Sequence, residues 1–195
     1  MTGRVTGDAE GRSATDHVSE AASATMDELV RLAALIARRL GDVGATVATA
    51  ESCTGGLIGH VLTEISGSSD WYLGGAVVYS NALKERLADV PAGLIVSQGA
   101  VSEAVAGALA IGIRQRVGSD LAVAVTGIAG PTGGTPGKPV GLTFVAVADA
   151  SGTAVEQHVW DGDRSANKRA SAHAALRLLL ERLTTMHAAL GRGAR

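Results

Sequence analysis

The sequence predicts a single-domain α/β fold, layered α/β/α around a mixed, mostly parallel sheet with one antiparallel hairpin. Three observations lead to this prediction. Short apolar runs alternate with longer segments of helical periodicity. One run, Leu121 to Val125, is apolar without interruption, as in a strand buried on both faces. Two later runs, 142–148 and 153–160, flank Asp149-Ala150-Ser151-Gly152, an arrangement typical of a hairpin.

The chain begins with a segment that has no apolar periodicity. Residues 1–24 are rich in Gly, Ser, Thr, Ala and charge, so we expect a disordered N-terminal tail ahead of a domain over residues 25–190. Thr25 and Glu28 have the spacing of a capping box. Apolar residues then recur at helical spacing as far as Gly41, where we expect the first helix to end.

The elements that follow alternate between strand and helix. In order we expect a strand over 45–50, a helix over 55–65, a strand over 71–79, a helix over 81–88, a connector with a short strand at 94–96, and a helix over 100–117 capped by Ser102. Residues 127–139 are too rich in glycine and proline for a regular element. A last helix is expected from about 164 to 190.

Composition narrows the function classes. The net charge is −2 and the domain has no run of Lys or Arg, which argues against nucleic acid as a partner. No apolar run approaches the ~18–20 residues that span a membrane, and no signal-peptide core is present, so we expect a cytoplasmic protein. The single cysteine excludes an intramolecular disulfide. The histidines show no ligand spacing, and we expect no metal and no cofactor.

Ser52 lies in the most specialised stretch, Ala-Glu-Ser-Cys-Thr-Gly-Gly over residues 50–56, where a predicted strand passes into a predicted helix. Hydroxyl groups and unpaired helix-start amides at such a turn bind an anion or stabilise an oxyanion. We therefore take Ser52 as the candidate nucleophile. The alternatives are that Ser52 or Thr54 caps the helix, or that Cys53 is the nucleophile. The residues of this turn expected to bind substrate are Thr54, Gly55 and Gly56.

A second polar segment follows the strand predicted over 71–79. Ligands gather at the carboxyl ends of strands in open α/β sheets, so Ser80 and Asn81 are candidate substrate contacts. Lys84 follows one helical turn later and would act as a base towards a serine if burial lowered its pKa. The alternative is a solvated lysine on a surface helix. Tyr79 is either a proton relay or a core aromatic residue.

A third segment joins Thr126, at the end of the 121–125 strand, to a glycine-rich loop. Glycines let backbone amides approach an anion, so we expect a phosphate cradle, with an ordinary mobile loop as the alternative. Its expected contacts are Gly127, Ala129 and Gly130. Arg164 is a candidate for bidentate binding of phosphate or carboxylate, whether or not Asp161 or Asp163 caps the last helix.

Seven blocks of the chain occur in a characteristic order. They are Thr49–Gly56, Gly67–Ser69, Val78–Asn81, Gly99–Ser102, Thr126–Pro131, Lys138–Gly141 and Gly162–Arg164. Together they resemble the CinA C-terminal domain family, whose enzymatic members are nicotinamide-nucleotide amidohydrolases. The resemblance runs from about residue 26 to 188. Many relatives also carry a long N-terminal domain of nucleotide-pyrophosphatase type, and we do not expect that second activity here.

The resemblance implies deamidation of nicotinamide mononucleotide to nicotinate mononucleotide and ammonia, by a serine amidase without a metal, in recycling of pyridine nucleotides. By position, Ser52 matches the nucleophile, and Tyr79 and Lys84 match proton-handling neighbours. Thr126 matches a hydroxyl position, and Arg164 matches a basic residue. The resemblance leaves open how Tyr79 and Lys84 divide the acid and base roles.

Three other functions stay open from the sequence. The chain is alternatively a catalytically silent module that binds a pyridine nucleotide or an ADP-ribose-like ligand, a structural partner protein with a vestigial pocket, or an amidase that uses Cys53. A small-molecule nucleotide is the expected partner. A homodimer through the glycine- and alanine-rich helix over 100–117 is also expected, although that face suits an internal core equally well.

Overall fold

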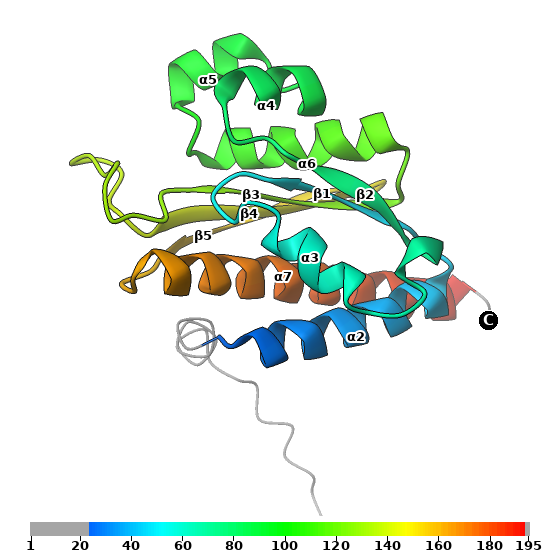
Figure 1. The fold of residues 1–195 in the computed structure, drawn as a ribbon. Helices are drawn as coiled ribbons and strands as arrows, with labels where there is room; N and C mark the ends of the chain where they lie inside the picture. The colour runs from blue at the N-terminus through cyan, green and yellow to red at the C-terminus, as the bar shows by residue number, and fades with distance from the viewer. Residues whose placement is uncertain (1–23, 194–195) are drawn as a thin grey trace, which may run out of the picture.

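Five strands form the central sheet, in the order β2-β1-β3-β4-β5 (Figure 1). A computed structural model describes residues 24–193, with side chains to residue 189. The strands are β1 (Val47–Glu51), β2 (Tyr72–Val77), β3 (Leu121–Gly127), β4 (Leu142–Asp149) and β5 (Gly152–Val159). β1 pairs in parallel with β2 and β3, whereas β4 is antiparallel to β3 and β5. The predicted mixed sheet with one hairpin is confirmed.

Helices cover both faces of the sheet, which confirms the predicted α/β/α layering (Figure 1). On one face lie α4 (Asn81–Ala88), α5 (Ala92–Gln98) and α6 (Glu103–Val117). On the other lie α2 (Met26–Val43), α3 (Leu57–Thr63) and α7 (Arg164–Gly193). A short 3-10 helix, Ser68–Asp70, precedes β2. The predicted tail lies outside the described residues except for Ala24, which is buried.

The two faces of the sheet differ in side-chain size. In β3, Leu121, Val123 and Val125 pack towards α2, α3 and α7. Ala122 and Ala124 alternate with them and pack towards α6. The small alanines let α6 lie close to the sheet.

The glycines of α6 extend this close packing to its neighbours. A Cβ at Gly112 would lie 1.7 Å from the carbonyl oxygen of Ala88, so only glycine fits where α6 crosses the end of α4. A Cβ at Gly107 would contact Val155 and Thr153 of β5. This helix face is internal core, which is the alternative that the sequence left open, and the homodimer stays a prediction.

Two boundaries expected from the sequence are corrected. The Thr25–Glu28 capping box is present, but α2 continues through Gly41 and ends at Gly44, whose φ of 63° suits the left-handed conformation that closes helices. The strand expected at 94–96 is helix α5. Its single buried residue, Ile95, belongs to the core cluster that includes α6, whereas Val96 is exposed.

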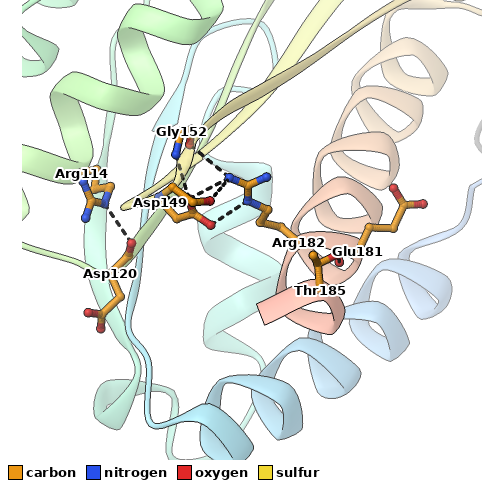
Figure 2. Close-up of polar contacts among 8 residues, drawn as sticks. Arg114, Asp120, Asp149, Gly152, Glu181, Arg182 and Thr185 are labelled. Carbon is orange, nitrogen blue, oxygen red and sulfur yellow. Dashed lines mark hydrogen bonds and ion pairs between the residues drawn. The ribbon is translucent and has the colours of Figure 1, made fainter. Parts of the chain in front are cut away.

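A partly buried ion pair joins the β4–β5 hairpin to α7 (Figure 2). Arg182 Nε and Nη2 donate to the two carboxylate oxygens of Asp149, at 2.6 and 2.8 Å. The amide and hydroxyl of Ser151 donate to the same carboxylate. The hydrogen bonds from Arg182 hold the pKa of Asp149 well below its usual range. This contact fixes the hairpin at the sheet end where β3 begins.

Candidate active site

A cavity of about 250 Å³ opens at the carboxyl ends of β1 and β3, where the three polar segments of the sequence meet. The predicted site residues that line it are Ser52, Tyr79, Asn81, Lys84, Thr126, Gly127, Ala129, Gly130 and Arg164. The other lining residues are Cys53, Ala100, Val101, Ile128, Thr132 and Gly133. Three neighbouring parallel strand ends therefore bring together residues that are far apart in the sequence.

Ser52 and Lys84 meet in the wall of the cavity. Lys84 Nζ lies 3.1 Å from Ser52 Oγ, and it also donates to the carbonyl oxygens of Val78 (2.8 Å) and Tyr79 (3.3 Å). Only 2% of Lys84 is exposed, and burial lowers its pKa. The alternative of a solvated surface lysine is therefore wrong. A buried amine at this distance from a hydroxyl has the geometry of a serine–lysine nucleophile and base pair.

Cys53 lines the same cavity but has the wrong protonation state for a nucleophile. Burial raises the pKa of its thiol to about 12. The thiolate is the reactive form of cysteine, and at neutral pH almost none is present here. The raised pKa of Cys53 thus favours Ser52 over Cys53 as the candidate nucleophile.

Glu51, which the sequence analysis did not single out, occupies the start of α3. The residue is 2% exposed, and its carboxylate accepts hydrogen bonds from the amides of Gly56 (3.0 Å), Ile58 (3.0 Å) and Gly59 (2.8 Å). The carboxylate satisfies the unpaired amides of the helix and interacts favourably with its dipole. The only sequence signal was an acidic residue at the end of an apolar strand.

The glycines of the turn consequently have a different role from the one expected. The amide of Gly56 binds Glu51, and that of Gly55 donates to the carbonyl oxygen of Ser52 at 3.1 Å. Neither glycine lines the cavity, so neither amide is available to an oxyanion. Thr54 is fully buried away from the cavity, and among the described residues its hydroxyl has no hydrogen-bond partner. These three residues thus lie outside the cavity lining, and substrate contact at them stays a prediction.

The residues that follow β2 have two roles, because some cap α4 and others line the cavity. Ser80 caps α4 through the amide of Leu83 and does not line the cavity, and its contact with substrate stays a prediction. Asn81 lines the cavity. Tyr79 is 58% exposed, and its hydroxyl accepts a hydrogen bond from Arg164 Nη2 at 3.0 Å. It is the main-chain carbonyl of Tyr79, not its hydroxyl, that contacts Lys84.

Arg164 begins α7 at the mouth of the cavity and is exposed. Besides its bond to Tyr79, it donates through Nη1 to the carbonyl oxygen of Gly130 at 2.8 Å. Asp163 accepts from the amide of Ala166 at 2.7 Å, so Asp163 caps the helix while the side chain of Arg164 lines the cavity. The guanidinium therefore links the β2–α4 connection to the glycine-rich loop.

Two further contacts shape the walls. Thr126 is 1% exposed and donates its hydroxyl to the carbonyl oxygen of Ala100 at 2.8 Å. Asn167, which sequence reasoning missed, is equally buried. Its side chain donates to the carbonyl oxygen of Ala129 and accepts from the amide of Gly162. Asn167 therefore joins the glycine-rich loop to the turn that carries Arg164. The sequence around this helical asparagine gives no signal of that role.

Within residues 24–193, no group of three His, Cys, Asp or Glu side chains is placed to hold a metal ion. None of the helices in this range combines the length and the apolar character needed to cross a membrane.

Comparison with known proteins agrees with this fold. The chain is 51% identical over 147 residues to a CinA-like protein of Salinibacter ruber. The aligned residues cover 75% of this chain and 36% of that protein. The chain is 49% identical over 150 residues to a CinA-like protein of Geobacter sulfurreducens, covering 77% and 36%. The chain thus spans little more than a third of the length of these relatives.

Solved structures show the same architecture. A competence/damage inducible protein, CihA, from Agrobacterium tumefaciens has a TM-score of 0.75 at 40% identity, covering 80% of this chain and 95% of that one. A competence damage-inducible protein A from Klebsiella pneumoniae has a TM-score of 0.77 at 33% identity, covering 80% and 97%. The model of the CinA C-terminal domain matches residues 29–183. The chain belongs to the CinA C-terminal domain family.

Proposed function

We propose that this chain is an amidohydrolase that converts nicotinamide mononucleotide to nicotinate mononucleotide and ammonia with Ser52 as nucleophile. The observation that carries the proposal is the 3.1 Å contact between Ser52 Oγ and the buried amine of Lys84, in the wall of a small-molecule cavity. Membership of the CinA C-terminal domain family supports the same activity.

The contacts of Lys84 favour it as the general base. A neutral amine has two N–H groups and one lone pair. The carbonyl oxygens of Val78 and Tyr79 take the two N–H groups, which turns the lone pair towards Ser52 Oγ. The Tyr79 hydroxyl is instead held by Arg164. We therefore assign both the base and the acid role to Lys84.

The reaction then proceeds in two halves. Ser52 Oγ gives its proton to Lys84 Nζ and attacks the carboxamide carbon. The C–N bond breaks as Lys84 returns that proton to the departing amine, which leaves as ammonia. Water then attacks the acyl ester while Lys84 takes a proton from the water. Finally Ser52 regains its proton as the carboxylate product leaves.

The oxyanion needs donors other than the glycine amides occupied by Glu51 and Ser52. The amide of Cys53 directly follows the nucleophile and donates to no oxygen among residues 24–193. An amide in this position contributes to the oxyanion hole of other serine hydrolases. We assign it that role here.

The phosphate of the nucleotide fits the other side of the cavity. None of the lining residues, all within the described part of the chain, is acidic, and Arg164 stands at the mouth beside the glycine-rich loop. Such a lining favours an anionic substrate. We assign phosphate binding to Arg164 and residues 127–134.

The test is ammonia release from nicotinamide mononucleotide in buffer that contains a chelator. We expect Ser52→Ala and Lys84→Met each to lose about 10³- to 10⁴-fold in kcat, as when one member of a catalytic unit is removed. Ser97→Ala, at an exposed serine of α5, is the matched control and retains activity. Cys53→Ala also retains it, whereas a large loss there would favour a cysteine nucleophile.

The outcome for the wild-type protein decides between enzyme and binding module. Folded protein that binds the nucleotide in calorimetry but releases no ammonia would replace this proposal with a catalytically silent module for a pyridine nucleotide or an ADP-ribose-like ligand. Activity that requires an added metal would contradict the metal-free mechanism.

A further inference from the structure

Tyr79 is the one aromatic side chain among the described residues that line the cavity. It is held at both ends. Its main-chain carbonyl accepts from Lys84 at 3.3 Å, and its hydroxyl accepts from Arg164 at 3.0 Å. Arg164 is itself tied to the carbonyl oxygen of Gly130 at 2.8 Å. The phenol ring therefore stands in a fixed place at the cavity mouth, with 58% of the residue exposed.

The described residues that line the cavity include no carboxylate that could bind a positively charged group of a ligand. None of the described lining residues is Asp or Glu. The nearest acidic residue in sequence to Ser52 is Glu51, which is buried and bonded to three main-chain amides of α3. A cationic ring in this cavity thus finds its attractive protein surface in the negative face of an aromatic ring.

We propose that Tyr79 makes the cavity selective for carboxamides on a cationic, N-substituted pyridinium ring, by stacking its phenol face on that ring. This inference rests on the proposed function. In this arrangement the carboxamide points to Ser52, and the phosphate points to Arg164, which holds the hydroxyl end of the same tyrosine. Tyr79 is then a specificity-determining residue rather than a proton relay.

The test compares the binding of two ligands that differ in ring charge. Nicotinamide mononucleotide has a cationic pyridinium, and its reduced form has a neutral dihydropyridine with the same carboxamide, ribose and phosphate. Dissociation constants are measured by calorimetry in a Ser52→Ala background, so that the different reactivity of the two carboxamides does not enter. The readout is the ratio of the two dissociation constants, reduced over oxidised.

Three substitutions at Tyr79 separate the ring from the hydroxyl. With Tyr79→Leu we expect the ratio to fall by about 2- to 30-fold, the range that cation–π contacts span. With Tyr79→Phe the ratio stays nearly unchanged, because the ring remains. With Tyr79→Trp the ratio rises, since indole binds cations best. A ratio that Tyr79→Leu leaves unchanged would overturn the proposal, as would a fall with Tyr79→Phe as large as that with Tyr79→Leu.

The outcome of this experiment is independent of whether the proposed function is correct. Ammonia release by the wild-type protein tests the reaction, whereas the ratio tests ring selectivity in an inactive variant. A protein without amidase activity that still shows the Tyr79-dependent ratio keeps this inference and loses the enzyme. An active amidase with a constant ratio loses only this inference. Because Tyr79 is largely exposed, we expect all three variants to fold, which circular dichroism checks.

Discussion

At the scale of single residues, the placement of Lys84 is the least expected feature of the chain, because lysine is almost never fully buried unless it is paired. The residue is 2% exposed, yet its amine has three oxygen neighbours, two of them main-chain carbonyls. Burial disfavours the ammonium form, and the carbonyl contacts fix the direction of the lone pair. These contacts support the proposal that Lys84 acts as the base towards Ser52.

The lowered pKa of Lys84 makes activity pH-dependent in a defined direction. Because only the neutral amine accepts the proton of Ser52, kcat/KM rises with pH as Lys84 deprotonates. The midpoint lies below the ordinary lysine value of about 10.4. A steady-state pH profile measures it. Lys84→Arg should be inactive at every pH, since arginine stays protonated. An unchanged pH profile in that variant would assign the base elsewhere.

The position of Arg164 predicts that its loss changes KM for one substrate and not for another. We expect Arg164→Ala to raise KM for nicotinamide mononucleotide by about 10- to 100-fold, the size of a lost charged hydrogen bond, while the use of free nicotinamide hardly changes. Steady-state kinetics with both substrates measures the split. Arg169→Ala, one helical turn further along α7, is the control, because Arg169 does not line the cavity and instead binds the carbonyl oxygen of Ala24. An unchanged KM in Arg164→Ala would remove the phosphate assignment.

At the scale of elements, the start of α3 shows how one buried carboxylate sets a turn. Glu51 ends β1 and accepts three amides of the following helix, so the chain between them, including Ser52, is held at a fixed geometry. A helix this short has little stability of its own and depends on such contacts.

Removing this carboxylate should destabilise the fold. Glu51→Ala leaves buried amides without an acceptor, and we expect a loss of about 2–3 kcal/mol in the free energy of unfolding. Glu51→Gln keeps one acceptor oxygen and should lose less. Urea denaturation gives the values. Glu64→Ala, at the exposed end of the same helix, is the matched control and should change stability by less than about 0.5 kcal/mol. Equal losses at the two positions would contradict the capping role.

At the scale of the whole molecule, α7 connects opposite ends of the sheet. Its first residue, Arg164, stands at the cavity, and Arg182 binds Asp149 where the β4–β5 hairpin turns (Figure 2). The cavity end has a buried amine and a buried thiol, whereas the opposite end has a partly buried ion pair with further hydrogen bonds from Ser151. We expect the second end to contribute stability.

The Asp149–Arg182 pair should make the fold sensitive to acid. The folded pKa of Asp149 lies below its unfolded value of about 3.9, so its stabilisation is complete above the unfolded value and is lost as the pH falls from there through the folded pKa. We expect Asp149→Asn to lose about 3 kcal/mol at neutral pH and to show a shallower fall in stability with acid. Denaturation at several pH values tests this. Asp42→Asn, at an exposed pair, is the control, and an effect there of the same size would contradict the assignment.

Much of the fold was predictable because its signals are local. The Thr25–Glu28 box, the Ser102 cap and the β4–β5 hairpin each depend on residues a few positions apart. The errors arose where tertiary contacts decide. Residues 94–96 favour a strand by type, but burial of Ile95 makes them helical. Gly41 resembles a helix end, but Gly44 has the left-handed conformation.

The sequence by itself determined the alternation of elements, the family, and the residue types at the strand ends. Only the tertiary structure decided which of these residues meet. Ser52 and Lys84 are 32 residues apart, and they touch because β1 and β2 pair in parallel and end at the same edge of the sheet. Local periodicity does not encode strand order, since pairing depends on long-range burial. For the same reason only the structure shows that Glu51, and not a substrate, takes the amides of the α3 start.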